Sequence, residues 1–160
     1  MTIGDKLKSG DKAPDFILPC DSDKNINLKE YLGSVVILFF YPKDDTPGCT
    51  KEAISFSENI SILNDLNTLV IGISKDTVTK HKKFKEKHSL KVSLASDFER
   101  DICEKYGVWV EKNMYGRKYM GIERTTFLID SKGIINKVWN KVKVSGHVEE
   151  VIMHIKNLSN

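Results

Sequence analysis

The side chains best suited to chemistry gather in residues 41–50, which read YPKDDTPGCT. Cys49 follows two prolines and a glycine, and apolar residues recur at helical spacing after it, so we expect this cysteine in the first turn of a helix. Free backbone N–H groups and the positive end of the helix dipole stabilise an anion at such a position. For a cysteine the anion is the thiolate, the form that attacks electrophiles, and the pattern therefore predicts a reactive thiol at Cys49.

The elements on either side of this cysteine would position it. Residues 35–40 (VVILFF) form a short apolar run rich in β-branched and aromatic side chains, which predicts a strand buried on both faces of a sheet. A helix is expected from about residue 50 to residue 66. A functional loop after a buried strand is typical of open α/β sheets, which place their sites at the carboxyl ends of parallel strands.

Similar patterns predict the remaining elements. A lysine-rich helix follows the second buried strand, with Asp76 as its expected cap, and residues 108–121 look irregular, with Gly116 and Gly121 as turns. The expected strands are residues 16–18, 26–28, 69–74, 92–94, 125–129 and 134–139; the other helices end near residue 88, span 97–106 and close the chain around residues 148–155. This order predicts one α/β domain over residues 1–160, with a mixed central sheet flanked by helices and an N-terminal β-hairpin; the thioredoxin-like fold is one such arrangement.

Composition narrows the class of protein. A chain of 160 residues with 40% hydrophobic content can form one domain with its own core, and a formal charge of +3 is too small to indicate a nucleic-acid partner. No apolar run is long enough to span a membrane, and three widely separated cysteines do not form the framework of a secreted disulfide protein. We therefore expect a cytoplasmic protein that binds neither nucleic acid nor membrane. The lysines between residues 75 and 91 are interpreted as a solvated helix face.

Several motifs resemble one enzyme family. Pro42, Thr46 and Cys49 stand in the spacing P-x-x-x-T-x-x-C, which is the peroxiredoxin signature. The longer stretch 40–50 resembles the bacterioferritin-comigratory, or Q-type, branch of the peroxiredoxins. Further stretches resemble the family in the same order along the chain, namely residues 10–16, 106–109 and 121–130. Together the matches cover most of the chain.

The resemblance implies an antioxidant thiol peroxidase that reduces hydrogen peroxide and organic hydroperoxides without a metal or an organic cofactor. Cys49 would be the peroxidatic cysteine, Thr46 and Arg124 its activating partners, and Pro42 the shield of the pocket. These residue types suit the chemistry, because arginine is a permanent cation that favours a thiolate and donates hydrogen bonds to peroxide oxygens. The N–H groups of Gly48 and Cys49 would hold the charge that develops on oxygen.

The chain departs from many Q-type relatives at the resolving cysteine. Those relatives carry it five residues after the peroxidatic cysteine, where this chain has Ile54. Cys20 and Cys103 remain, and both are interpreted as small buried residues. We expect a monomeric one-cysteine peroxidase whose Cys49 sulfenic acid is reduced by an external thiol such as thioredoxin or glutathione. A two-cysteine cycle with Cys103 as the resolving residue is the alternative.

Other interpretations of the same residues stay open. A thioredoxin-like thiol oxidoreductase without peroxidase activity would need a second cysteine at position 52, which is Glu52. Thr46 could cap the helix as well as serve the site, and Glu52 would be a surface or network residue. The histidines form no metal-ligand pattern and are expected on the surface: His81, His88, His147 and His154.

Overall fold

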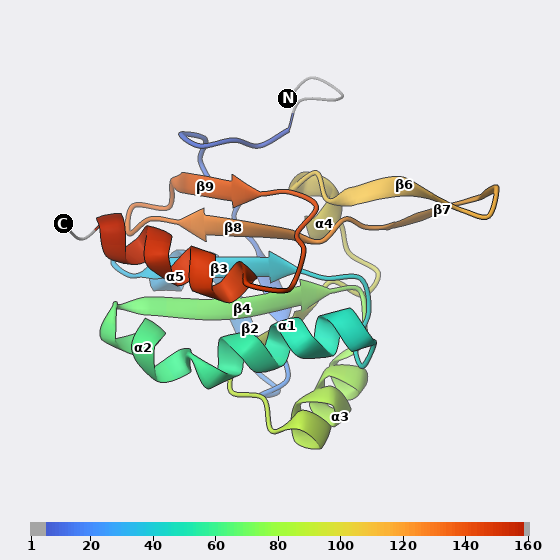
Figure 1. Ribbon diagram of the computed structural model, residues 1–160, viewed down its shortest axis with the longest axis horizontal. Coiled ribbons are helices and arrows are strands. Elements are labelled where there is room, and N and C mark those ends of the chain that lie inside the picture. The colour runs from blue at the N-terminus through green and yellow to red at the C-terminus, as the bar shows by residue number, and fades with distance from the viewer. Residues whose placement is uncertain (1–5, 159–160) are drawn as a thin grey trace.

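A five-stranded mixed sheet forms the centre of the protein (Figure 1). The computed structural model describes residues 6–158. The strand order is β5–β4–β3–β8–β9, with parallel pairing of β3 with β4 and of β4 with β5, and antiparallel pairing of β3 with β8 and of β8 with β9. The strands are β3 (Val35–Phe40), β4 (Thr68–Ser74), β5 (Ser93–Ser96), β8 (Thr125–Ile129) and β9 (Ile135–Trp139).

The strand β3 lies in the middle of the sheet because its side chains are apolar on both faces. Val36, Leu38 and Phe40 pack into one hydrophobic cluster. Ile37 and Phe39 alternate with them and pack into a second cluster on the opposite face. The predicted strand with two buried faces is therefore confirmed.

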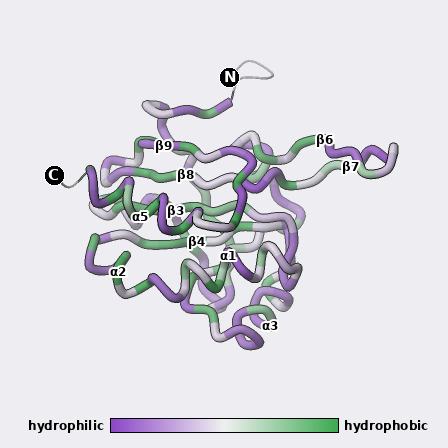
Figure 2. The backbone as a smooth tube through the Cα atoms, viewed as in Figure 1, coloured by the Kyte–Doolittle hydropathy of each residue, from purple (hydrophilic) through white to green (hydrophobic). Residues whose placement is uncertain are grey.

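Each face of the sheet has its own cover. The helices α1, α2 and α5 lie over the Ile37 and Phe39 face, in front of the sheet in Figure 1, and the β1–β2 hairpin, a short 3-10 helix and α4 cover the other face. Figure 2 shows hydrophobic segments along the central strands and a largely hydrophilic α3. The bounds are β1 (Ile17–Pro19), β2 (Asn25–Asn27), the 3-10 helix η1 (Leu28–Tyr31), α1 (Pro47–Glu58), α2 (Ile60–Asp65), α3 (Val78–His88), α4 (Ile102–Lys105) and α5 (His147–Leu158).

The predicted mixed sheet, flanking helices and N-terminal hairpin are confirmed, but two helices differ from expectation. The helix expected from about residue 50 to 66 begins at Pro47 and is broken at Asn59, whose side-chain amide donates to the Ser55 carbonyl at 2.8 Å. The helix expected over residues 97–106 is only one turn long. The carboxylate of Asp97 instead accepts the N–H groups that begin α4.

The stretch 108–121, expected to be irregular, forms a two-stranded hairpin that projects from the body of the protein (Figure 1). Its strands are β6 (Trp109–Met114) and β7 (Arg117–Ile122), and Gly121 lies within β7 rather than in a turn. Tyr115 and Gly116 connect them, both with positive φ (52° and 80°). Two positive φ angles in a two-residue turn match the twist of the strands, but a tyrosine at the first position is not the usual signal for such a turn.

The lysine-rich helix α3, expected to present a solvated face, uses several of its lysines in contacts with other elements. Three of its lysines form ion pairs with aspartates of the β1–β2 turn and of residues 41–46, the loop between β3 and α1 that precedes Cys49 (the Cys49 loop). These pairs fasten the helix to both. The pairs are Lys82–Asp23, Lys85–Asp21 and Lys87–Asp45. The expected cap, Asp76, is displaced by Thr77, whose hydroxyl accepts the N–H of Lys80.

Within residues 6–158, the structure contains no helix that combines the length and the apolar character needed to cross a bilayer.

A glycine in β4 makes room for the aromatic packing beneath the Cys49 loop. A Cβ at Gly72 would lie 2.6 Å from Cζ of Phe39. The Phe39 ring is fully buried and stacks on both Tyr41 and Phe56, so a shift of the ring would disturb these contacts. We expect Gly72→Ala to lower the free energy of unfolding by about 1–3 kcal/mol, measured by urea denaturation, because it overpacks the core.

The double variant Gly72→Ala/Phe39→Leu is the control for that prediction. Shortening the side chain at position 39 removes the overlap, so the cost of Gly72→Ala should be smaller in this background. An equal cost in both backgrounds would show that contact with the ring is not the cause.

Candidate active site

Cys49 is the third residue of α1 and is almost completely buried, with 1% of its surface exposed. The first hydrogen bond of the helix runs from the Thr50 N–H to the Thr46 carbonyl at 2.8 Å. Pro47 has no N–H, so Gly48 and Cys49 supply the amide groups that the first turn leaves without a helical acceptor. The thiol and these two donors therefore share the positive end of the helix.

Thr46 occupies the N-cap position of α1 but does not cap it with its side chain. Its hydroxyl donates to the Lys43 carbonyl at 2.9 Å instead. The expected capping role is therefore wrong. Because the hydroxyl donates this bond, its oxygen can still accept a hydrogen bond from another group. Thr46 lies three residues before Cys49, at the end of the loop that leads into α1.

Arg124 connects the Cys49 thiol to a buried carboxylate. It directly precedes β8, and since Thr125 pairs with Phe40, Arg124 arrives beside the loop that leaves β3. Its Nη2 donates to Sγ of Cys49 at 3.3 Å, and its Nη1 donates to Oε1 of Glu52 at 2.8 Å. Burial opposes the charge of Arg124, but Glu52 and Cys49 outweigh burial and raise the pKa of the guanidinium.

Gly48 allows this close approach. A Cβ at position 48 would lie 3.1 Å from Nη2 of Arg124, which is tighter than ordinary van der Waals contact. A side chain at position 48 would require the guanidinium to shift by a few tenths of an ångström, away from its present contact with the first turn of α1.

Glu52 is buried within the network and is not a surface residue. Its Oε1 accepts from Arg124, whereas its Oε2 is one of the few buried side-chain polar atoms in residues 6–158 without a hydrogen-bond partner. Burial raises the pKa of Glu52 to about 7, because the charge of Arg124 offsets only part of the lost solvation. The carboxyl group therefore changes its protonation state near neutral pH.

The two other cysteines lie across the sheet from this site. Cys49 belongs to the hydrophobic cluster on the Ile37 face, whereas Cys20 and Cys103 belong to the cluster on the opposite face. All three are free. Burial and the neighbouring carboxylate of Asp97 strongly raise the pKa of the Cys103 thiol, so this thiol stays protonated.

Two further residues are Pro42, in the loop between β3 and α1, and Lys112, which interacts electrostatically with Arg124 and Cys49. Pro42, expected to shield the pocket, is an exposed residue directly after Tyr41. Lys112 extends from β6 across Gly121, and burial followed by the charge of Arg124 lowers its pKa. Lys112 was not predicted, because a lysine in a stretch taken as irregular carries no signal of its own.

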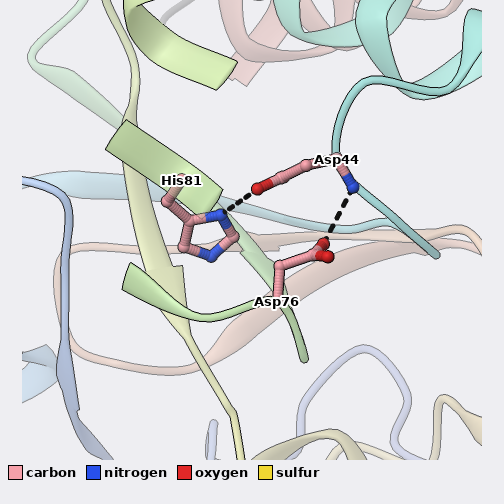
Figure 3. A group of neighbouring side chains, drawn as sticks. All are labelled: Asp44, Asp76 and His81. Atoms are coloured by element: carbon pink, nitrogen blue, oxygen red, sulfur yellow. Dashed lines mark hydrogen bonds and ion pairs between the residues drawn. The ribbon is translucent and has the colours of Figure 1, made fainter. Parts of the chain in front are cut away.

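The histidines are not all on the surface. His81 and His147 are buried, whereas His88 and His154 are partly exposed. His81 forms, with Asp44 and Asp76, the one group of metal-ligand types that lies close together in the described part of the chain, with ligand atoms within 4.8 Å (Figure 3). Nδ1 of His81 bonds directly to Asp44 at 2.6 Å, so a proton occupies the place where a metal would need a lone pair.

Residues 9–138 match the AhpC/TSA family. The chain belongs to that family. Putative peroxiredoxin Bcp of Coxiella burnetii is 54% identical over 91% of this chain and 97% of its own length, and peroxiredoxin Bcp of Bacillus subtilis is 45% identical over 96% and 98%. A mutant of PrxQ from Xylella fastidiosa superposes with a TM-score of 0.93 at 34% identity, covering 98% of this chain and all of that one.

The protein is therefore a peroxiredoxin of the Bcp/PrxQ type, and the predicted thioredoxin-like fold is confirmed. As a peroxiredoxin it is a thiol-dependent peroxidase that uses a hydroperoxide substrate and a thiol reductant.

The raised pKa of Glu52 predicts how the stability of this peroxiredoxin depends on pH. Because the folded-state pKa of about 7 exceeds the ordinary value of 4.5, the native protein binds more protons than the unfolded chain between these pH values. The free energy of unfolding should therefore fall, relative to that of Glu52→Gln, as pH rises through this window, by up to about 3 kcal/mol. Urea denaturation of both proteins at matched pH values would measure the difference.

The comparison with Glu52→Gln cancels the contributions of other titrating groups. A difference that stays constant or grows with pH would mean that the Arg124 ion pair, rather than burial, dominates the ionisation of Glu52.

Proposed function

We propose that Cys49 is the peroxidatic cysteine and that the protein reduces hydrogen peroxide and organic hydroperoxides with this one cysteine. The observation that carries the proposal is the 3.3 Å hydrogen bond from Arg124 to a buried sulfur in the first turn of α1. A fixed cation and the end of a helix both favour the thiolate over the thiol.

In the proposed reaction the thiolate attacks the terminal oxygen of the hydroperoxide. The S–O bond forms as the O–O bond breaks, which leaves a cysteine sulfenic acid and an alkoxide that takes a proton to become an alcohol, or water when the substrate is hydrogen peroxide. Arg124 and the N–H groups of Gly48 and Cys49 stabilise the charge that moves onto oxygen. The Thr46 hydroxyl orients the peroxide, and Pro42 at the loop surface limits the entry of water.

The reductive half of the cycle needs an external thiol. A first thiol displaces water from the sulfenic acid and forms a mixed disulfide with Cys49, and a second thiol releases the Cys49 thiol and a reductant disulfide. Placement of Cys103 and Cys49 on opposite faces of the sheet supports this route, because bridged cysteines need Cα atoms within about 7 Å. The protonated state of Cys103 also argues against it as the resolving nucleophile.

Thioredoxin and glutathione remain the proposed reductants, and we propose a single-domain, monomeric, cytoplasmic enzyme that needs no cofactor. The pairing of α3 lysines with aspartates supports the view that this helix serves the fold rather than a nucleic-acid partner.

Intact-mass measurement after one equivalent of hydrogen peroxide tests the proposal. Wild type and Cys103→Ser should each gain one oxygen that a sulfenic-acid trap captures, whereas Cys49→Ser should gain none. Loss of two hydrogens in wild type, absent from both variants, would establish the two-cysteine cycle with Cys103. The absence of any rapid reaction at Cys49 would overturn the peroxidatic assignment.

Removal of the Arg124 guanidinium should slow the reaction of Cys49 with hydrogen peroxide by about 100-fold or more, because the site loses both a cation and a donor to the peroxide. Stopped-flow measurement of Arg124→Gln would give the rate constant. Arg117→Gln, at the exposed start of β7, removes the same charge away from the thiol and should react like wild type. Equal losses in the two variants would assign the effect to net charge alone.

A further inference from the structure

A buried hydrogen-bond network includes Tyr41 and Asp44 of the Cys49 loop, and Figure 3 shows the contacts of Asp44 with His81 and Asp76. The hydroxyl of Tyr41, just after β3, donates to Oδ1 of Asp44 at 2.6 Å. The other carboxylate oxygen of Asp44 lies 2.6 Å from Nδ1 of His81 on α3. Nε2 of the same ring lies 3.0 Å from the carbonyl oxygen of Ala95 in β5. The network therefore joins the loop to the strand β5 and the helix α3.

Both ring nitrogens of His81 face an oxygen. The Ala95 carbonyl can only accept, so Nε2 carries a hydrogen and donates it. One further proton lies between Nδ1 and the Asp44 carboxylate. Tyr41 and His81 are fully buried, so water cannot replace a lost partner, and removal of one member leaves the others unsatisfied.

The main chain of Asp44 is fixed as well. Its N–H donates to Oδ2 of Asp76 at 2.8 Å, and the same oxygen accepts from the Ser74 hydroxyl at 2.6 Å. Asp44 is thus held both by its backbone and by its side chain.

The shape of the loop depends on these contacts. Of the residues between β3 and α1, only Tyr41 and Asp44 are buried. Thr46 follows Asp44 by two residues, and its hydroxyl is directed by the Lys43 carbonyl on the other side of Asp44. Any shift of Asp44 would therefore move the Thr46 hydroxyl and the first N–H groups of α1.

We propose that His81 and Asp44 are positioning residues for the peroxidase reaction, which hold the loop so that Thr46 and the first turn of α1 meet the peroxide at Cys49. The proposal rests on the proposed function of Cys49. Neither residue touches the reacting atoms, and each acts through the loop.

The chemistry of the network supplies a conservative variant. In Asp44→Asn, the amide oxygen can accept from Tyr41, the amide nitrogen can donate to Nδ1 of a neutral His81, and Nε2 can still donate to Ala95. Every hydrogen bond of the network is thereby kept without a carboxylate. Asp44→Ala and His81→Ala break it, and Tyr41→Phe removes one bond while keeping the ring.

Two rate constants of Cys49 separate positioning from general destabilisation. Sulfenic acid formation with hydrogen peroxide needs the arranged loop, whereas alkylation by iodoacetamide needs only an accessible thiolate. We expect Asp44→Ala and His81→Ala to slow the peroxide reaction by about 10- to 100-fold with little change in alkylation, and Asp44→Asn to behave like wild type. Val151→Ala, a buried deletion in α5, controls for lost stability and should leave the ratio of the two rates unchanged.

Parallel changes in both rates, or an Asp44→Asn variant as slow as Asp44→Ala, would overturn the proposal. If the alanine variants do not fold, Tyr41→Phe is the test variant. It should lose a smaller part of the peroxide rate than the alanine variants, with little change in alkylation. An unchanged ratio of the peroxide rate to the alkylation rate would contradict the proposal. A wild-type protein that forms no sulfenic acid at Cys49 would overturn the proposed function itself, whereas normal wild-type reaction with unaffected variants would overturn only the positioning role.

Discussion

The guanidinium of Arg124 bridges a thiol and a carboxylate that are both shielded from water. A cation withdrawn from much of its water is stabilised by pairing and hydrogen bonds. Glu52 supplies most of that compensation to the partly buried Arg124 at 2.8 Å, and the sulfur of Cys49 lies slightly farther away at 3.3 Å. The sulfur of Cys49 accepts the other hydrogen bond of the guanidinium. Oε2 of Glu52 has no hydrogen-bond partner among the described residues, so Arg124 is the group that stabilises the charge of this carboxylate.

The topology of the sheet makes this contact possible. Because β3 pairs in parallel with β4 and antiparallel with β8, the carboxyl end of β3 lies beside the amino end of β8. The loop that carries Cys49 leaves the first of these ends, and Arg124 enters at the second. On its other side the loop is held by α3, through Asp44 to His81 and through Asp45 to Lys87 and His88. The site is therefore enclosed by elements from both halves of the sheet.

The sequence predicted the parts of this arrangement that local pattern determines. The buried strand, the cysteine in the first turn of α1 and the strands β8 and β9 all follow from periodicity and turn residues. Arg124 could be selected only by family resemblance, because the pairing that brings it to Cys49 is a tertiary contact. The burial of His81 and Glu52 was missed for a similar reason. The sequence around a polar residue in a helix does not indicate which residue of another element pairs with it. The β6–β7 hairpin was missed because Tyr115 replaces the usual turn residue.

Ribosomal synthesis produces Cys49 well before Arg124. The hydrogen bond between Arg124 and Cys49 joins residues 75 positions apart, and the central strand β3 lacks its β8 neighbour until that later segment has folded onto the sheet. Such distant pairings close slowly, after local helices and turns have formed. A nascent chain that has emerged only as far as α3 carries Cys49 and the side chains that fasten its loop, but no guanidinium. Under the proposed mechanism, the reaction of Cys49 with peroxide would therefore depend on completion of the fold, because Arg124 reaches the thiol only then.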